Sequence, residues 1–313
     1  MTTYKEVVGT AILDYAGDVP NAVEGQVWYN STGKNFRLST GVVANAWATG
    51  GNLNTARFGP GGVGTYTAAL AFGGKGAAGY TVNTEKYNGT AWTEVNNLNT
   101  ARFGLAGAGT QPAALAFGGG YPSVAITETW NGTNWTEVND LGTARYNLAG
   151  CGTNTAALAF GGGENTIALT EVWNGTNWTE VNDLNTARRQ LAGAGTTTAA
   201  LAFGGAAPAK NETETWNGTN WTEVNNLTTA RQYLAGCGTS TAALGFGGNP
   251  PATGATEVWN GTNWVEGNDL NTARGNLAAA GTSADALGIG GGQPGIASTE
   301  LWAEAGGNKT LTS

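Results

Sequence analysis

The 313-residue chain carries a net charge of −8, and only 12% of its residues are charged. Nucleic-acid backbones and anionic membranes need clustered Lys and Arg, so this composition argues against both as main partners. The sequence contains no histidine, which removes the commonest metal ligand and the commonest general base. We therefore expect no cofactor and no metal. Abundant Gly, Thr and Asn indicate an all-β protein.

Residues 1–41 come before the repetitive part of the chain. Their opening, MTTYKEVVGTAILDYAGD, has a short apolar stretch but neither a basic start nor a small-residue cleavage site. It is therefore not interpreted as a signal peptide. No run of 18 apolar residues occurs in the sequence, so no membrane insertion is expected.

Between residues 42 and 305, one unit repeats six times. Thr-Ala-Arg recurs first after 45 residues and then every 43 residues. A fixed period of this length is the sequence signature of a repeat architecture. The repeated arginines are Arg57, Arg102, Arg145, Arg188, Arg231 and Arg274. The repeated tryptophans are Trp47, Trp92, Trp135, Trp178, Trp221 and Trp264, and Trp302 ends a second aromatic series.

Residues 145–183 show how one unit divides into four predicted strands. YNLAGCGT is the first, TAALAF the second, LTEVW the third and NWTEVNDL the fourth. The first two are apolar almost throughout, which is typical of strands buried on both faces, whereas the last two alternate. Six such units predict a six-bladed β-propeller with four antiparallel strands in each blade.

The hexapeptide WNGTNW joins the third and fourth strands at residues 130–135, 173–178, 216–221 and 259–264. Asn-Gly is a strong hairpin signal. The two tryptophans are therefore expected to lie close across a hairpin and to cover the gap to the neighbouring unit. The centre of the turn is either Asn-Gly or Gly-Thr. Stacking of a ligand on the tryptophans is the alternative role.

The two ends of the repetitive part predict how the ring closes. The first repeat element is a fourth strand around Trp47, and the last is a third strand, STELW, which no NGTNW follows. A strand from the N-terminal side should therefore complete the last blade and leave no open edge. This divides the chain into an N-terminal attachment segment (1–41), a propeller (42–305) and a C-terminal tail (306–313).

The order of apolar strand, Gly-Gly, aromatic residue, tryptophan and arginine resembles the kelch repeat, which also forms the central domain of galactose oxidase. Tryptophan stands where kelch repeats commonly have a third-strand tyrosine. The TARxxLAGAGTxTAALAFGG arrays and the segment NAVEGQVWYNSTGKNFR (residues 21–37) resemble virion structural proteins of tailed bacteriophages, especially those of marine cyanobacteria. The resemblance implies a kelch-type propeller located on a phage particle, with residues 1–41 bound to other virion proteins.

Each unit also carries one third-strand glutamate, which together with the arginine indicates a repeated ion pair. A ring of six arginines that binds an anion is the alternative. Cys151 and Cys237 occupy equivalent positions, where three other units have alanine, so we expect small buried side chains there. A disulfide or a metal pair is the alternative. The repeated glutamates are Glu85, Glu128, Glu171, Glu214, Glu257 and Glu300.

Two regions vary among the six units: the pair of residues after each arginine, and the loop between the second and third strands. In a propeller both open on the same face, so this face is predicted to bind a ligand. Drift of unconstrained loops is the alternative. The predicted residues are Phe58, Phe103, Tyr146 and Tyr233 near the central mouth, Tyr80, Tyr121, Asn165 and Lys210 further out, and Arg189 and Asn276 from the variable pairs.

These features predict a non-enzymatic virion protein, such as a tail fibre, a receptor-binding protein or a capsid decoration, that contacts a host surface glycan or protein. The alternatives are a secreted or surface bacterial lectin and a polysaccharide lyase or hydrolase. Galactose oxidase chemistry needs copper held by histidines, so that site has no counterpart in this sequence. Trimeric or hexameric assembly of the chain stays open.

Overall fold

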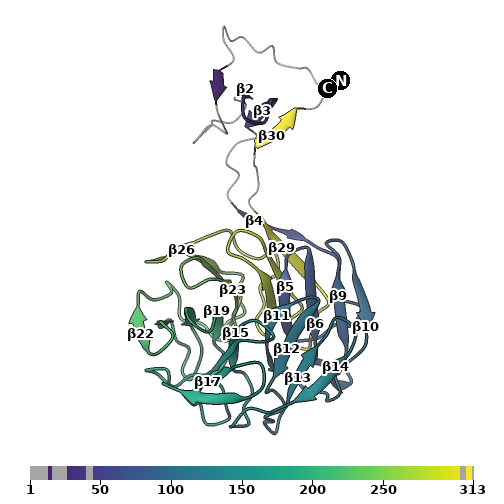
Figure 1. Ribbon diagram of the computed structural model, residues 1–313, viewed down its shortest axis with the longest axis vertical. Helices are drawn as coiled ribbons and strands as arrows, with labels where there is room; N and C mark the ends of the chain where they lie inside the picture. Colours follow the sequence, from purple (N-terminus) through teal and green to yellow (C-terminus); the bar gives the residue numbers. More distant parts are fainter. Residues whose placement is uncertain (1–12, 16–26, 40–44, 304–307, 312–313) are drawn as a thin grey trace. The chain divides into compact units, whose positions relative to one another are not determined.

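The computed structural model describes residues 13–15, 27–39, 45–303 and 308–311, which belong to two compact units. The larger unit, Ala46–Ala303, consists of six four-stranded antiparallel sheets in a ring (Figure 1). All regular secondary structure in the described ranges is β, and no helix there is long and apolar enough to cross a membrane. The predicted six-bladed β-propeller is confirmed; the kelch type stays a prediction.

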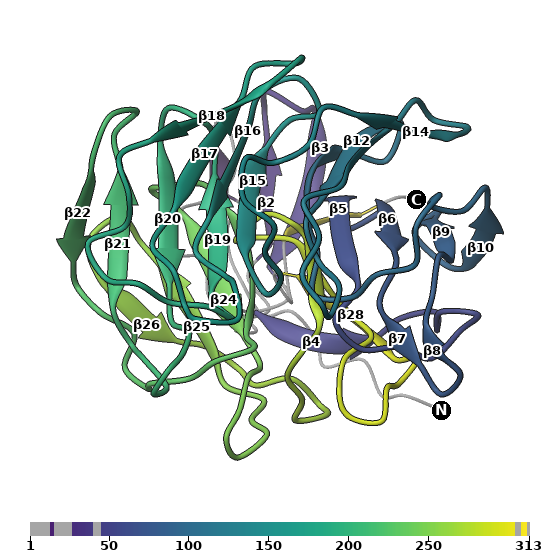
Figure 2. The ribbon, with the colours of Figure 1, turned by 90° about the horizontal axis from the view of Figure 1, so that it is seen from below.

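Blades 1 to 5 are meanders that run in chain order from the first, innermost strand to the fourth, outermost one; Figure 2 shows β19 to β22 side by side in this order. Blades 1 and 2 consist of β5 (Gly61–Thr65), β6 (Ala68–Phe72), β9 (Thr84–Tyr87) and β10 (Trp92–Val95), then β11 (Ala106–Thr110), β12 (Ala113–Phe117), β13 (Thr127–Trp130) and β14 (Trp135–Val138). A small hairpin of β7 (Lys75–Gly76) and β8 (Gly79–Tyr80) follows β6.

The remaining blades repeat the pattern with slightly shorter strands. Blades 3 and 4 consist of β15 (Ala149–Gly152), β16 (Ala157–Phe160), β17 (Thr170–Trp173) and β18 (Trp178–Val181), then β19 (Ala192–Gly195), β20 (Ala200–Phe203), β21 (Thr213–Trp216) and β22 (Trp221–Val224). Blades 5 and 6 consist of β23 (Ala235–Gly238), β24 (Ala243–Phe246), β25 (Thr256–Trp259) and β26 (Trp264–Glu266), then β27 (Ala278–Gly281), β28 (Ala286–Ile289), β29 (Thr299–Ala303) and β4 (Ala46–Thr49).

Blade 6 confirms the predicted ring closure. Its fourth strand, β4, precedes all the other blades in sequence and pairs antiparallel with β29. Trp47 lies opposite Trp302 in this register, and the two ring centroids are 5.4 Å apart. The Trp47 indole N–H also donates to Thr256 Oγ1 of blade 5 at 2.9 Å. The strand β4 therefore both completes blade 6 and contacts the neighbouring blade 5.

The second strand of each blade is buried on both sides, as predicted, but the first strand is not. Every residue of β16 is fully buried, whereas buried and partly exposed residues alternate along β15. The partly exposed positions of β15 are Gly150 and Gly152, which line the central channel. A Cβ atom on Gly150 would lie 2.4 Å from Phe117 Cζ of the preceding blade. Glycine therefore allows the first strand to pack closely against the Phe117 ring of the preceding blade.

The WNGTNW hairpin has the structural role that its sequence predicts. Asn131 N–H donates to the Asn134 carbonyl oxygen at 3.2 Å, so Gly132-Thr133 form the centre of the turn, and Gly132 has φ +94°. The Trp130 and Trp135 ring centroids are 5.4 Å apart. Trp135 also lies 5.0 Å from Phe72 of the preceding blade and donates to its Thr84 Oγ1 at 3.0 Å. The second tryptophan thus fills the space between blades, which leaves ligand stacking without support.

Each blade buries the predicted arginine–glutamate pair. In blade 2, Arg102 Nη2 is 3.0 Å from Glu128 Oε1, and neither side chain is more than 1% exposed. Asn99 N–H, in the connection from blade 1, donates to Glu128 Oε2 at 2.8 Å. The pair therefore ties successive blades together, and its burial leaves the guanidinium no access to an anion. The equivalent pairs are Arg57–Glu85, Arg145–Glu171, Arg188–Glu214, Arg231–Glu257 and Arg274–Glu300.

The two cysteines are buried and free, so the disulfide alternative is wrong. Burial raises the pKa of the Cys151 and Cys237 thiols from 9.0 to about 12. The reactive thiolate is therefore scarce near neutral pH in the folded state. Since the unfolded thiols ionise first, the free energy of unfolding should fall as the pH rises from about 9 to about 12.

We expect native protein to resist a thiol reagent near neutral pH and to react at both cysteines once unfolded. The double variant Cys151→Ala/Cys237→Ala should fold, because alanine occupies the same position at Ala108, Ala194 and Ala280. It should also lose less stability above about pH 9 than the parent does. Parallel unfolding curves at neutral and alkaline pH measure the difference. Rapid labelling of the native protein would contradict the assigned burial.

The smaller unit contains Met1–Asn45 and Glu304–Ser313. Its sheet has the order β1 (Leu13–Tyr15), β2 (Val27–Asn30), β3 (Asn35–Ser39) and β30 (Asn308–Leu311). The predicted attachment segment and the predicted C-terminal tail thus contribute strands to one sheet. Residues 1–12, 16–26, 40–44, 304–307 and 312–313 of these regions lie outside the described part of the chain, and the attachment role stays a prediction.

Candidate ligand-binding face

The structure places both variable regions at the same end of the blades. Gly120 N–H donates to the Phe103 carbonyl oxygen at 2.8 Å, and Gly163 N–H donates to that of Tyr146 at 2.9 Å. In blade 4, Arg189 and Ala206 exchange two backbone hydrogen bonds. The residue after each conserved arginine is therefore joined to the loop that leaves the second strand. We call this end of the propeller the variable face.

A closed belt of six backbone hydrogen bonds surrounds the central mouth of this face. Each donor is the residue two positions after an arginine, and its N–H bonds to the carbonyl oxygen of the equivalent residue in the preceding blade at 2.7–2.9 Å. All six have a left-handed backbone, with φ between 54° and 61°, where Gly and Asn cost least. The belt consists of Gly59, Gly104, Asn147, Gln190, Tyr233 and Asn276.

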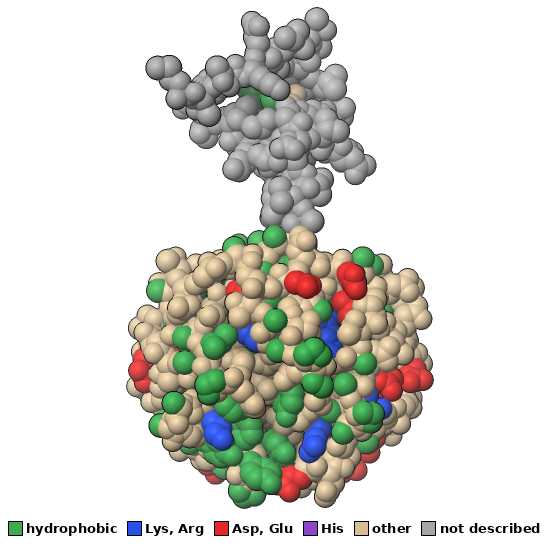
Figure 3. Space-filling model, turned by 180° about the vertical axis from the view of Figure 1, so that it is seen from behind, with side chains coloured by type: hydrophobic (Ala, Val, Ile, Leu, Met, Phe, Trp, Pro, Cys, Tyr) green, Lys and Arg blue, Asp and Glu red, His purple; other side chains and the backbone are tan. Residues whose placement is uncertain are grey.

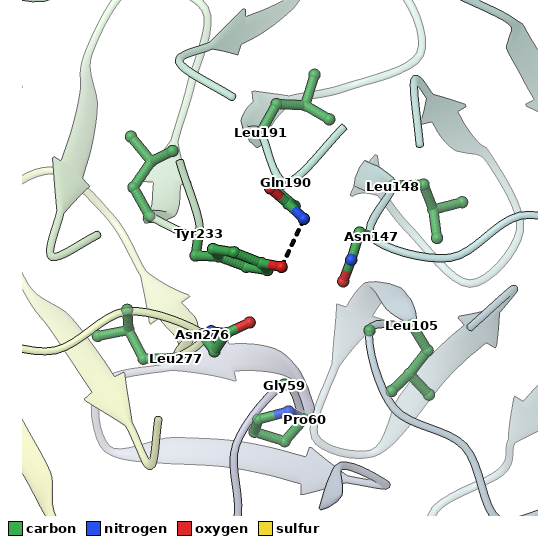
Figure 4. A pocket seen from close by; sticks show the side chains of 12 residues that line it. Gly59, Pro60, Leu105, Asn147, Leu148, Gln190, Leu191, Tyr233, Asn276 and Leu277 are labelled. Atoms are coloured by element: carbon green, nitrogen blue, oxygen red, sulfur yellow. Dashed lines mark hydrogen bonds between the residues drawn. The ribbon is translucent and has the colours of Figure 1, made fainter. Parts of the chain in front are cut away.

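The belt side chains, together with the leucines that follow them, line a small pocket of about 80 Å³ at the mouth (Figure 4). Gln190 Nε2 donates to Tyr233 Oη, which the dashed line in Figure 4 marks. Burial raises the pKa of Tyr233, against the opposing effect of nearby Arg189. The phenol is therefore neutral at physiological pH, and its hydroxyl can donate to a bound group. Asn147 and Asn276 project toward the same space.

Five of the predicted residues form one continuous cluster, the aromatic arc. Tyr80 stacks on Phe103 with 5.0 Å between ring centroids, and Phe103 lies 6.1 Å from both Phe58 and Tyr146. Tyr121 lies 5.8 Å from Tyr146. Tyr80 is 36% exposed and Tyr121 is 61% exposed, whereas Phe58 is buried. The arc follows the variable loops of blades 1 to 3 and presents two accessible tyrosines.

The other predicted residues are not part of this cluster. Arg189 Nη1 donates to the Glu164 carbonyl oxygen at 2.7 Å. Lys210 Nζ pairs with Glu212 Oε1 at 3.2 Å. Asn165 is exposed in the loop after β16. Tyr233 and Asn276 belong to the mouth pocket instead, together with Asn147 and Gln190, which the sequence-based selection left out. Four of the six residues that stand two positions after the arginines are Gly or Asn, and this pattern could have predicted that these positions share one backbone conformation.

On the face that Figure 3 draws, Lys and Arg side chains lie singly among hydrophobic and uncharged polar ones. Within the described residues, no group of three or more His, Cys, Asp or Glu could hold a metal ion. The third-strand glutamates are engaged by buried arginines and backbone N–H groups.

Comparison with known proteins assigns no family. No protein-family model matches the chain, and no curated protein matches its sequence.

Proposed function

We propose that this protein is a non-enzymatic adhesion protein of a bacteriophage particle and that its variable face binds a host surface glycan. The aromatic arc carries the proposal. Stacked and edge-on rings with two exposed tyrosines, such as Tyr80 and Tyr121, offer a surface on which the C–H face of a sugar ring stacks, while the tyrosine hydroxyls bind sugar hydroxyls. Exposed aromatic clusters of this kind commonly mark interaction sites.

The virion context rests on the resemblance of residues 21–37 and of the repeats to virion structural proteins. It assigns the N-terminal segment to contacts with other virion proteins. A non-enzymatic role is supported by the uniformity of the repeats, because the same glutamate in every blade serves the scaffold. Mass analysis of purified particles tests this context. Absence of the chain from the particles would rule out the virion role.

Binding to a glycan array tests the aromatic arc. We expect the parent protein to bind a small set of surface glycans. Replacing both exposed rings, Tyr80→Ala/Tyr121→Ala, should weaken binding about tenfold, because an aromatic contact contributes about 0.5–1.5 kcal/mol and about 1.4 kcal/mol corresponds to tenfold. Val265→Thr is the control, since Val265 is 54% exposed and four other blades carry threonine there. Silence of the parent across the array would contradict glycan binding.

A further inference from the structure

A larger pocket opens on the variable face between blades 5 and 6. Its volume is about 350 Å³, within the range of small-ligand sites. The lining includes Asn249 from the blade 5 loop, Gly275 and Asn276 from the segment before β27, and Gln293 and Ile296 from the blade 6 loop. Asn276 also lines the central mouth, so the two hollows are neighbours.

Gly275 creates this space. It is the residue after the conserved arginine, where the other blades carry Phe58, Phe103, Tyr146, Arg189 and Gln232. Its backbone is not left-handed, so the conformation does not require glycine. A Cβ atom there would instead lie 2.2 Å from Asn249 Oδ1. Glycine at position 275 therefore leaves space for the Asn249 carboxamide and for the pocket beside it, which a larger side chain would fill.

Asn249 supplies an acceptor that lacks a protein partner. Its backbone exchanges two hydrogen bonds with Gln232, which hold the residue in place. Its Oδ1 atom is buried and has no hydrogen-bond partner within the described structure. A buried, unpaired acceptor is unfavourable unless a bound group donates to it. Only blade 5 has such a side chain, since the equivalent residues are Lys75, Gly120, Gly163, Ala206 and Gly292.

The charge of the pocket limits the ligand class. Arg274 lines the pocket but is paired with Glu300, and neither side chain is more than 3% exposed. Thr272, Asn276 and Gln293 contribute uncharged polar groups, and Ile296 contributes an apolar wall. An anion would find no free cation among these lining residues. A ligand with hydroxyl donors and one apolar side matches them better.

We propose that this pocket holds a single uncharged pyranose ring, and that the Asn249 carboxamide turns from its position against Gly275 so that Oδ1 accepts a hydrogen bond from one of the ring hydroxyl groups. The proposal rests on the glycan-binding function and identifies where a terminal sugar would be held. The arc and the pocket are then two parts of one face: the arc contacts the glycan on its surface, and the pocket encloses one ring.

Saturation-transfer NMR with monosaccharides tests the pocket in the full chain. The probes are the methyl glycosides of glucose, galactose and mannose, N-acetylglucosamine, and anionic N-acetylneuraminic acid. We expect transfer to at least one uncharged sugar. Asn249→Ala, which copies Ala206 of blade 4, should weaken binding about tenfold through the lost hydrogen bond. Gly275→Phe, which copies Phe58 and Phe103, should abolish it, and circular dichroism and thermal unfolding check that both variants fold.

Three results would overturn the pocket: no transfer to any uncharged sugar at millimolar concentration, transfer to N-acetylneuraminic acid alone, or unchanged transfer in folded Asn249→Ala. Tyr80→Ala/Tyr121→Ala separates the two proposals, because it should leave monosaccharide binding intact while weakening array binding. If both pocket variants still bind the array as the parent does, the proposed sugar pocket is contradicted, whereas glycan binding by the aromatic arc is supported. Monosaccharide binding with a silent array supports the pocket and contradicts the glycan-adhesion role.

Discussion

Glu214→Ala is expected to lower the free energy of unfolding of the propeller by about 3–5 kcal/mol. The substitution leaves the Arg188 guanidinium buried at 0% exposure without its counter-charge. It also removes the acceptor of two Asn185 groups, the N–H at 2.7 Å and Nδ2 at 2.9 Å, which hold the connection from blade 3. Urea unfolding followed by tryptophan fluorescence measures the loss.

The same blade offers a matched control for this substitution. Glu212 pairs with Lys210 at 3.2 Å, but these side chains are 27% and 17% exposed. Glu212→Gln should therefore change stability by no more than about 1 kcal/mol. Arg188→Met/Glu214→Leu should recover part of the loss, because it removes the buried charge but leaves Asn185 unpaired. Equal effects of Glu214→Ala and Glu212→Gln would contradict a buried clamp between blades.

A chain of residues 50–303, which lacks β4, is expected to fail to form a stable monomeric propeller. Blade 6 would lose its fourth strand, and β29 would become an open edge. The Trp47 ring, 6% exposed, would no longer cover Phe246 at 4.7 Å or Trp302 at 5.4 Å. Truncation of a buried tryptophan alone costs about 3–5 kcal/mol, to which the lost strand pairing adds. Size-exclusion chromatography should show aggregated or domain-swapped protein.

The control for this truncation is a chain of residues 45–303. It keeps β4 and omits the smaller unit, so it should elute as a folded monomer with nearly the melting temperature of the parent. Adding residues 45–49 as a separate peptide should raise the stability of the 50–303 chain, and the gain should grow with the logarithm of the peptide concentration once the peptide exceeds its dissociation constant. A 50–303 chain that is monomeric and as stable as 45–303 would show that β4 is dispensable for closure.

The repeat also explains why the variable face is asymmetric. Most residues that join blades recur from unit to unit, as the contacts of Trp135 with Phe72 and of Trp221 with Phe160 illustrate, although blade 6 has Ile289 where the other blades have phenylalanine. The side chain of the residue after each arginine is not one of these recurring contacts, so it differs from blade to blade. Aromatic rings on blades 1 to 3 and a glycine on blade 6 therefore give one ring two distinct surfaces.

Sequence periodicity determined the scaffold, because the interactions that stabilise each blade recur at one interval. Six copies of the arginine, the glutamate and the aromatic pair, which is Trp–Trp in five blades and Tyr87–Trp92 in blade 1, were enough to predict six blades, the buried ion pairs and closure by the strand around Trp47. The prediction that the first strand of each blade is buried on both faces was wrong. Its glycines line the central channel, and a sequence does not show that this strand faces the axis.

The arrangement of residues on the variable face depended on the tertiary structure. Tyr80 stacks on Phe103 only because the ring places a loop of blade 1 against the start of blade 2. The belt joins residues more than 40 positions apart in the sequence. Gly and Asn indicate its left-handed backbone in four blades, but Gln190 and Tyr233 give no such indication in the other two. The pocket arises because blade 6 has a glycine, Gly275, where the other blades have larger residues, and because this glycine lies beside Asn249 of the preceding blade. These contacts on the variable face combine residues that differ from repeat to repeat, so no single repeat encodes them.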